Sequence, residues 1–118
     1  MSELTTLSGG AIITDSSWTA TSSTNWTTGN NLFTADLGSP KTVGGMFIDI
    51  SNFTSGKAVT IQLQTQNTGG TYTTFNQYSV TAGTDPDLIL VSQFLAENIR
   101  VRITASETVV INYRYFYT

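Results

Sequence analysis

Threonine recurs along the whole of this chain and stands at alternate positions within several short apolar runs. It is β-branched and stiff at χ1, so it suits the pleated surface of a strand and disfavours a helix. In Val59–Leu63, which reads Val-Thr-Ile-Gln-Leu, every second residue is apolar. Because successive side chains of a strand point to opposite faces, this pattern predicts a strand with one face in a core and the other in water.

The same alternation recurs in two later segments. Ile99–Ile103 alternates with Arg100 and Arg102, whereas Val109–Tyr117 is apolar on one face and partly apolar on the other. The latter suits a strand that is covered on both sides or lies at an interface. One segment, Ser92–Asn98, fits a single helical turn. Further strands are expected at Leu32–Leu37, Val43–Ile50, Tyr72–Val80 and Leu88–Val91. About seven or eight short strands at this spacing predict an all-β fold, an antiparallel jelly-roll β-sandwich.

Turn signals separate these runs. Asn67–Thr71 reads Asn-Thr-Gly-Gly-Thr between two alternating segments and predicts a hairpin turn in which glycine supplies a positive φ. Gly38–Lys41 and Gly83–Asp87 are further breaks, each containing a proline. We expect Asp36 to stabilise the turn before Pro40.

The chain has 118 residues, which suits one domain with a single core. Residues 1–10 are polar and end in two glycines, so they are predicted to form an N-terminal arm. Residues 11–118 are predicted to form a single β-sandwich domain. Asp15–Asn31 holds both tryptophans without regular alternation, and we expect a large loop there, or two loops around a short strand.

The composition restricts the possible functions. Histidine and cysteine are absent, which removes the commonest general base, the thiol nucleophile and the best ligands for transition metals. Asp85 and Asp87 flank a proline but belong to no complete calcium-loop pattern. The sequence therefore argues against an enzyme and predicts no cofactor and no metal site.

The charge pattern excludes two classes of partner. The net charge is −3 and no basic stripe is present, so no nucleic-acid partner is expected. No apolar run approaches the roughly 20 residues of a membrane helix, so no membrane insertion is expected. Charged residues make up only 11% of the chain, so hydroxyls and amides must cover most of its surface. Such surfaces are common where proteins face the outside or pack against copies of themselves.

Trp18 and Trp26 are the best candidates for a binding site. Indole rings in a polar loop can stack on sugar faces, while Asn25, Asn30 and Asn31 supply hydrogen bonds. The alternative is that each tryptophan plugs one end of the sandwich.

Phe53, in a polar segment between Asn52 and Thr54, is a third aromatic candidate, with burial in the core as its alternative. The predicted ligand-binding residues are therefore Trp18, Asn25, Trp26, Asn30, Asn31 and Phe53.

Three arginines form a second cluster of interest. Arg100, Arg102 and Arg114 lie in alternating segments and are expected to share an outward face. They would bind an acidic partner or form salt bridges with Glu97 and Glu107.

Three segments carry a family resemblance. Phe33–Gly45 has an aromatic residue, an Asp-Leu-Gly strand end, a proline turn and then Val-Gly-Gly before an apolar strand. Val59–Phe75 has a strand, a glycine-rich turn and an aromatic residue, and Glu97–Ile103 reads Glu-Asn-Ile-Arg-Val-Arg-Ile. In this order the segments resemble the discoidin family, the coagulation-factor type C domains. The resemblance implies a galactose-binding-like jelly roll, a superfamily that mostly binds glycans, lipids or proteins through loops at one end.

Two functions are compatible with these features. The first is a non-enzymatic structural protein of a virion, such as a phage capsid decoration or tail-associated protein, which contacts other virion proteins and copies of itself. This function is favoured by a start at Met1 without a signal peptide, from which we expect synthesis in a host cytoplasm. It is also favoured by the absence of cysteine and by a lone β domain. The alternative is an extracellular carbohydrate-binding module that recognises glycans through the Trp-bearing loop. Both hold together if a virion surface binds host glycans.

Overall fold

The computed structural model describes the backbone of residues 4–6 and 12–15, and residues 17–117 in full. This part of the chain contains eleven strands and no helix. The strands are β1 (Leu4–Thr6), β2 (Ile12–Asp15), β3 (Thr19–Ala20), β4 (Thr24–Asn25), β5 (Asn30–Asp49), β6 (Ala58–Gln66), β7 (Tyr72–Thr81), β8 (Leu88–Val91), β9 (Phe94–Ala105), β10 (Thr108–Val109) and β11 (Asn112–Tyr117). The predicted all-β antiparallel sandwich is confirmed, with additional strands of only two to four residues.

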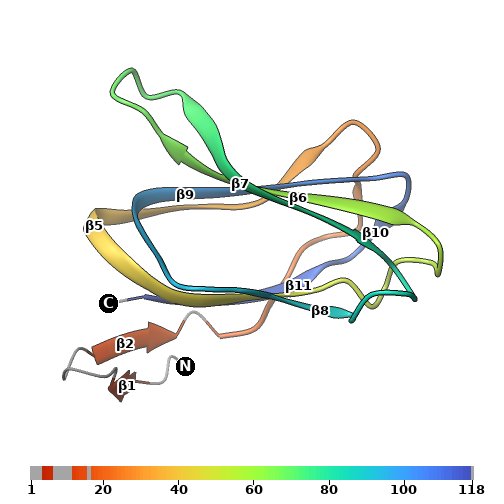
Figure 1. The fold of residues 1–118 in the computed structure, drawn as a ribbon, viewed down its shortest axis with the longest axis horizontal. Coiled ribbons are helices and arrows are strands. Elements are labelled where there is room, and N and C mark those ends of the chain that lie inside the picture. The colour runs from red at the N-terminus through yellow and green to blue at the C-terminus, as the bar shows by residue number, and fades with distance from the viewer. Residues whose placement is uncertain (1–3, 7–11, 16, 118) are drawn as a thin grey trace.

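Every strand pairing is antiparallel. One sheet follows the order β1-β2-β11-β5-β9-β6-β7, with β3 also beside β11 and β8 also beside β5. The sheet folds over on itself into two layers (Figure 1). The upper layer in that view holds β7, β6, β9 and the first part of β5, and the lower layer holds the second part of β5 with β8 and β11. β4 and β10 form a separate two-stranded ribbon.

The strand β5 bends from the upper layer into the lower layer. The register of β5 on β9 shifts between Asp36 and Lys41, and Gly38 there has a φ of 84°. Glycine tolerates this conformation, so β5 bends here and remains paired with β9 on both sides of the bend. The two strands expected at Leu32–Leu37 and Val43–Ile50 are for this reason one long strand. The Asp36 carboxylate accepts a 2.9 Å hydrogen bond from the Gly38 N–H, which confirms its predicted role in this turn.

β9 bends with β5 at the same place. Phe94 and Leu95 pair with Val43 and Thr42 of β5, so the backbone that was expected to form a helical turn at Ser92–Asn98 is extended from Phe94 onward. That prediction is wrong because pairing with β5 satisfies these backbone groups between strands rather than within a helical turn.

The core lies between the two layers and follows the predicted alternation. Val59, Ile61 and Leu63 of β6 are buried, and so are the apolar residues at alternate positions of β9. From the lower layer, Met46 and Ile48 of β5 face them. Burying each such side chain contributes roughly 1.5–3 kcal/mol relative to leaving it in water.

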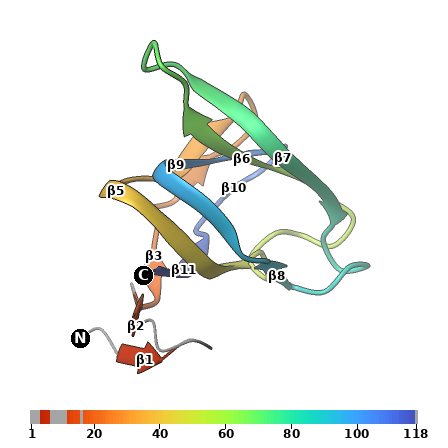
Figure 2. The ribbon, with the colours of Figure 1, turned by 60° about the vertical axis from the view of Figure 1, so that its left-hand side comes forward.

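The chain before β3 continues the lower layer. β2 pairs with the end of β11 through Asp15 and Thr14, and β1 pairs with β2, so this hairpin extends the sheet away from the body (Figures 1 and 2). Of the predicted arm, residues 1–10, the described part is Leu4–Thr6, which is the strand β1. Residues 1–3 and 7–10 lie outside the described residues.

Candidate functional site

Two of the three predicted aromatic site residues belong to the core. Trp26 is 0% exposed and Phe53 is buried as well, so the expectation that these rings are open to a ligand is wrong. The Trp26 indole N–H donates a 3.0 Å hydrogen bond to the carbonyl of Val109. The one polar group of the side chain is thus hydrogen-bonded although the whole ring is buried. This supports the alternative interpretation, in which Trp26 closes one end of the sandwich.

Two of the predicted asparagines organise a turn. The Asn25 side-chain oxygen accepts a hydrogen bond from the Thr27 N–H at 3.0 Å, and the Asn30 amide donates to the Asn25 carbonyl at 2.7 Å. The turn closes with a 3.0 Å bond from the Gly29 N–H to the carbonyl of Trp26. Asn25 and Asn30 therefore stabilise the loop that docks Trp26.

The remaining two predicted residues lie in different layers of the sandwich. Trp18 is 48% exposed and lies just before β3 in the lower layer. Asn31 is exposed on β5 opposite Arg102, in the upper layer. The structure therefore does not bring the six predicted residues together into one loop site.

Trp18 is part of an apolar surface on the outside of the lower layer. Its ring centroid lies 6.4 Å from that of Phe47, which in turn meets Phe116 edge-on at 5.3 Å. Leu90 stands opposite Phe47 across β5 and β8, and Leu88 lies two residues along the same strand. We call these five residues, Trp18, Phe47, Leu88, Leu90 and Phe116, the aromatic face.

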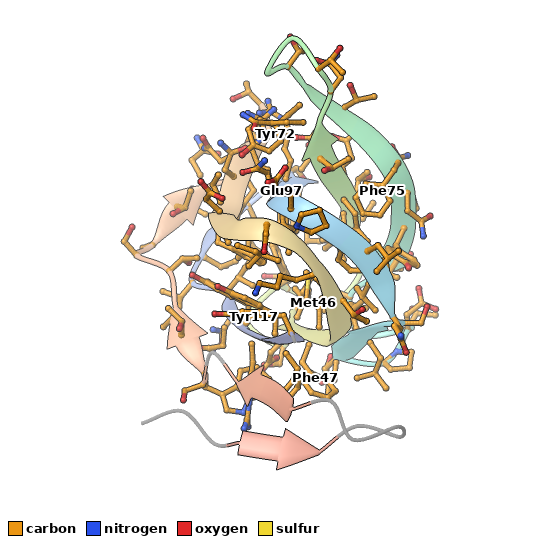
Figure 3. All side chains as sticks on the ribbon, turned by 90° about the vertical axis from the view of Figure 1, so that its left-hand side faces the viewer. Met46, Phe47, Tyr72, Phe75, Glu97 and Tyr117 are labelled. Atoms are coloured by element: carbon orange, nitrogen blue, oxygen red, sulfur yellow. The ribbon has the colours of Figure 1, made fainter. Side chains whose placement is uncertain are left out.

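Local sequence explains the aromatic face. β8 reads Leu-Ile-Leu-Val, and its buried residues Ile89 and Val91 leave Leu88 and Leu90 exposed, at 42% and 62%. In β5, Met46 points between the layers and the adjacent Phe47 points out of the lower layer (Figure 3). Sequence reasoning missed Phe47, Leu88 and Leu90 as surface candidates, whereas Phe116 belongs to the second, partly apolar face that was predicted for Val109–Tyr117. The available signal was the consecutive apolar residues, because a strand without alternation is apolar on both faces.

The outside of the upper layer is different. The Arg100 Nε donates a 2.7 Å hydrogen bond to the side-chain oxygen of Gln64, whose amide nitrogen donates to Thr74 Oγ1 at 3.0 Å. The Arg100 guanidinium carbon lies 4.3 Å from the ring centre of Tyr72. We call the outer side of this layer the polar face. Its outward residues are Asn31, Thr34, Thr60, Gln62, Gln64, Tyr72, Thr74, Gln77, Ser79, Arg100, Arg102 and Thr104.

The three arginines do not share one face, which corrects that expectation. Arg100 and Arg102 lie on the polar face, whereas Arg114 of β11 lies in the lower layer over the ring of Phe116, at 5.1 Å. Within residues 17–117, neither Arg100 nor Arg102 has a carboxylate partner.

Glu107, one of the expected salt-bridge partners, instead binds Thr54. Its carboxylate accepts hydrogen bonds from the Thr54 hydroxyl and from the Thr54 N–H, the latter at 2.7 Å. The bond from the Thr54 hydroxyl, followed by the bond from its N–H and the positive charge of Lys57, lowers the pKa of Glu107. Glu107 therefore fastens the loop after β5 to the loop before β10.

A stack of aromatic rings joins the first part of β5, in the upper layer, to β11 in the lower layer. The Phe33 ring lies parallel to those of Tyr113 and Tyr115, with centroids 4.7 and 4.9 Å away, and Tyr117 follows Tyr115 at 6.0 Å. Burial raises the pKa of Tyr113 and of Tyr115, since it disfavours the phenolate. Tyr113, Tyr115 and Tyr117 stand at alternate positions of β11 and pack against the core, so they form the apolar face of the segment Val109–Tyr117.

Clefts and metal clusters do not occur among residues 17–117, whose side chains the structure describes. No pocket opens there, and no group of three or more potential acidic ligands gathers there. None of these residues belongs to a helix that could cross a membrane. In this part of the chain the candidate sites are the two outer faces.

The fold and its faces define an antiparallel β-sandwich with one aromatic and one polar outer surface. No family model, curated protein or solved structure matches the chain.

Proposed function

We propose that this protein is a non-enzymatic structural protein of a virion, a phage capsid decoration or tail-associated protein, which attaches through its aromatic face. The observation that carries the proposal is the exposure of Trp18, Leu88 and Leu90 in one contiguous surface, together with Phe47 and Phe116. Monomeric proteins rarely leave large contiguous apolar patches in water, and such patches commonly mark interaction sites.

The composition of the aromatic face suits the centre of a protein interface. Tryptophan is among the residues that contribute most to binding, and aromatic residues are enriched at interface cores. Trp18 lies next to Phe47, so a partner would contact a continuous set of rings rather than one isolated side chain.

The size of this surface favours a particle over a stable dimer. The aromatic face consists of five residues, Trp18, Phe47, Leu88, Leu90 and Phe116, whereas each side of a stable two-chain interface comprises about 20–30 residues. We therefore take the occupant to be an apolar surface of a virion shell or tail protein, where many copies attach in an array. The low charge content, 11% with a net charge of −3, allows neighbouring copies to lie close together with little repulsion.

The proposal is tested on particles from the source of the sequence. Antibodies raised against the recombinant protein should detect it in the virion band of a density gradient. Recombinant protein should also rebind to particles from which it has been stripped. Detection only in the soluble fraction would contradict the assignment to a virion.

The role of the aromatic face is tested with a double variant. Trp18→Ala with Leu90→Ser should reduce rebinding at least tenfold, because it removes the most exposed ring and the most exposed leucine of the face. Leu95→Ser is the control, since Leu95 is 77% exposed but lies at the bend of β9, outside the aromatic face. Equal rebinding by the double variant and the wild type would exclude this face as the contact.

The alternative is a carbohydrate-binding module, located outside the cell, that uses the Trp-bearing loop. Within the predicted set, Trp18 is the aromatic residue whose ring is exposed, so it would have to supply the stacking surface. Glycan-array binding that is lost in Trp18→Ala, by a protein absent from particles, would favour this alternative over the virion proposal.

A further inference from the structure

The polar face holds two arginines side by side without an acidic partner. Arg100 and Arg102 are two residues apart on β9, so they leave the same side of the strand about 7 Å apart. β9 lies between β5 and β6, inside the sheet rather than at its edge. The chain carries only five basic residues, and its net charge is −3. Two adjacent positive charges without a carboxylate in residues 17–117 repel each other unless an anion lies between them.

Arg100 is fixed in position by neutral groups. Its Nε is bonded to Gln64, which is only 7% exposed and is itself held by Thr74. The ring of Tyr72 supports the guanidinium group from one side. The terminal nitrogens of Arg100 make no hydrogen bond to the described residues, so they remain available to a ligand.

Arg102 is fixed by the turn that follows Trp26. Its Nη2 donates a 3.3 Å hydrogen bond to the carbonyl of Thr28. A Cβ placed on Gly29 would lie 2.8 Å from Nη2 and 2.9 Å from Nε. The guanidinium therefore rests against the backbone of Gly29, and a side chain at that position would displace it. Because both side chains are already ordered, a ligand would lose little of its binding free energy to ordering them.

The surroundings of these arginines indicate the chemistry of the ligand. Thr34 stands opposite Arg100 on β5, and Asn31 stands opposite Arg102. On the other side, the Gln62 amide nitrogen donates a 3.1 Å bond to the side-chain oxygen of Gln77. Hydroxyl and amide groups of this kind match the hydroxyls of a sugar chain, and the guanidinium fork matches the paired oxygens of a carboxylate or sulfate.

A protein partner fits the polar face less well. Protein interfaces have an apolar centre, and the exposed large apolar residues of the described chain lie elsewhere: Trp18, Leu88 and Leu90 on the aromatic face, and Phe75 and Leu95 near the bend. We infer that the polar face binds an acidic polysaccharide, whose carboxylate or sulfate groups are held between Arg100 and Arg102. This inference is independent of the virion proposal, since it concerns the opposite layer of the sandwich.

Immobilised polysaccharides provide the first test. The full-length protein should bind heparin or polygalacturonate and should not bind neutral dextran in biolayer interferometry at low salt. Polygalacturonate carries carboxylates only, so comparing it with heparin separates the two oxyanions. Arg100→Gln with Arg102→Gln should weaken binding at least tenfold. The control, Lys41→Gln with Lys57→Gln, lowers the net charge by the same two units elsewhere and should change binding less than twofold.

Three outcomes of this test would overturn the inference. The first is that neither acidic polysaccharide binds. The second is an equal loss of binding in both double variants, since this would indicate non-specific attraction. The third is binding of polyglutamate as tight as that of either polysaccharide, which would indicate an acidic protein partner instead.

A second test uses the unmodified protein, in case the arginine variants fold poorly. In NMR titrations with a heparin tetrasaccharide, the Nε–H signals of Arg100 and Arg102 and the amides of β9 should move most. Shifts concentrated on the aromatic face, or at the end closed by β4 and β10, would place the ligand elsewhere and contradict the inference.

Discussion

The two outer faces of this sandwich differ although the strands that form them share one core. In the upper layer, outward positions hold Thr60, Gln62 and the two arginines of β9. In the lower layer, the corresponding positions hold the rings and leucines of the aromatic face. Alternation is therefore strict where a face meets water and is lost where both faces are apolar. The difference teaches that the lower layer carries apolar side chains on both of its sides, whereas the upper layer carries them mainly on the side that faces the core.

The largest expected effect distinguishes the buried Trp26 from Trp18 on the aromatic face by the stability that each contributes. Trp26→Ala should lower the free energy of unfolding by about 3–5 kcal/mol, because it empties the end of the core and leaves the Val109 carbonyl without its donor. Trp18→Ala should lower it by less than about 1 kcal/mol, because a half-exposed ring contributes little to folding.

Urea unfolding, followed by tyrosine fluorescence and circular dichroism, measures both variants. Similar losses for the two substitutions would mean that Trp18 is a structural residue and that the aromatic face is part of the core.

A smaller effect is expected at the glycine beneath the polar face. Gly29 and Gly56 both have a positive φ, 85° and 93°, so alanine at either position costs about 1–2 kcal/mol for the backbone alone. A Cβ at Gly56 meets open space, whereas one at Gly29 meets Arg102. Gly29→Ala should therefore cost about 0.5–1.5 kcal/mol more than Gly56→Ala, because the flexible end of Arg102 must move and loses its hydrogen bond to the Thr28 carbonyl.

Equilibrium unfolding of both alanine variants gives this difference. It should shrink when Arg102 is also replaced by alanine, because the clashing group is then gone. An unchanged difference in that background would show that Arg102 does not rest on Gly29.

The strands were predictable because their signal is local. Alternation located β6 and the second half of β9, and the turn signals on either side located β7 and β8. The glycine-rich segment Asn67–Thr71 forms the expected turn, with Gly70 at a φ of 79°. The continuity of β5 was not predictable, since a glycine and a proline ordinarily end a strand. Whether such residues end a strand or bend it depends on the neighbour, here β9, which no local pattern reveals.

The site was harder to predict because burial in an irregular loop depends on distant partners. Trp26 is buried through a hydrogen bond to Val109, which lies 83 positions away in the sequence. Phe53 is likewise buried by the core beneath its loop. The aromatic face depends on β3, β5, β8 and β11 lying side by side, and the sequence identifies such strands without giving their order.

The smallest expected effect on stability comes from two neighbouring residues of β8 that point to opposite faces. Leu90→Ser should change the free energy of unfolding by less than about 0.5 kcal/mol, because Leu90 is 62% exposed. Val91→Ser should cost about 2 kcal/mol or more, since it places a hydroxyl in the core and removes buried methyl groups. Leu90→Ser should nevertheless reduce the binding of a hydrophobic dye to the folded protein, because the aromatic face loses its most exposed side chain. If Leu90→Ser were as destabilising as Val91→Ser, both sides of β8 would be core, and the lower layer would no longer present a free apolar surface.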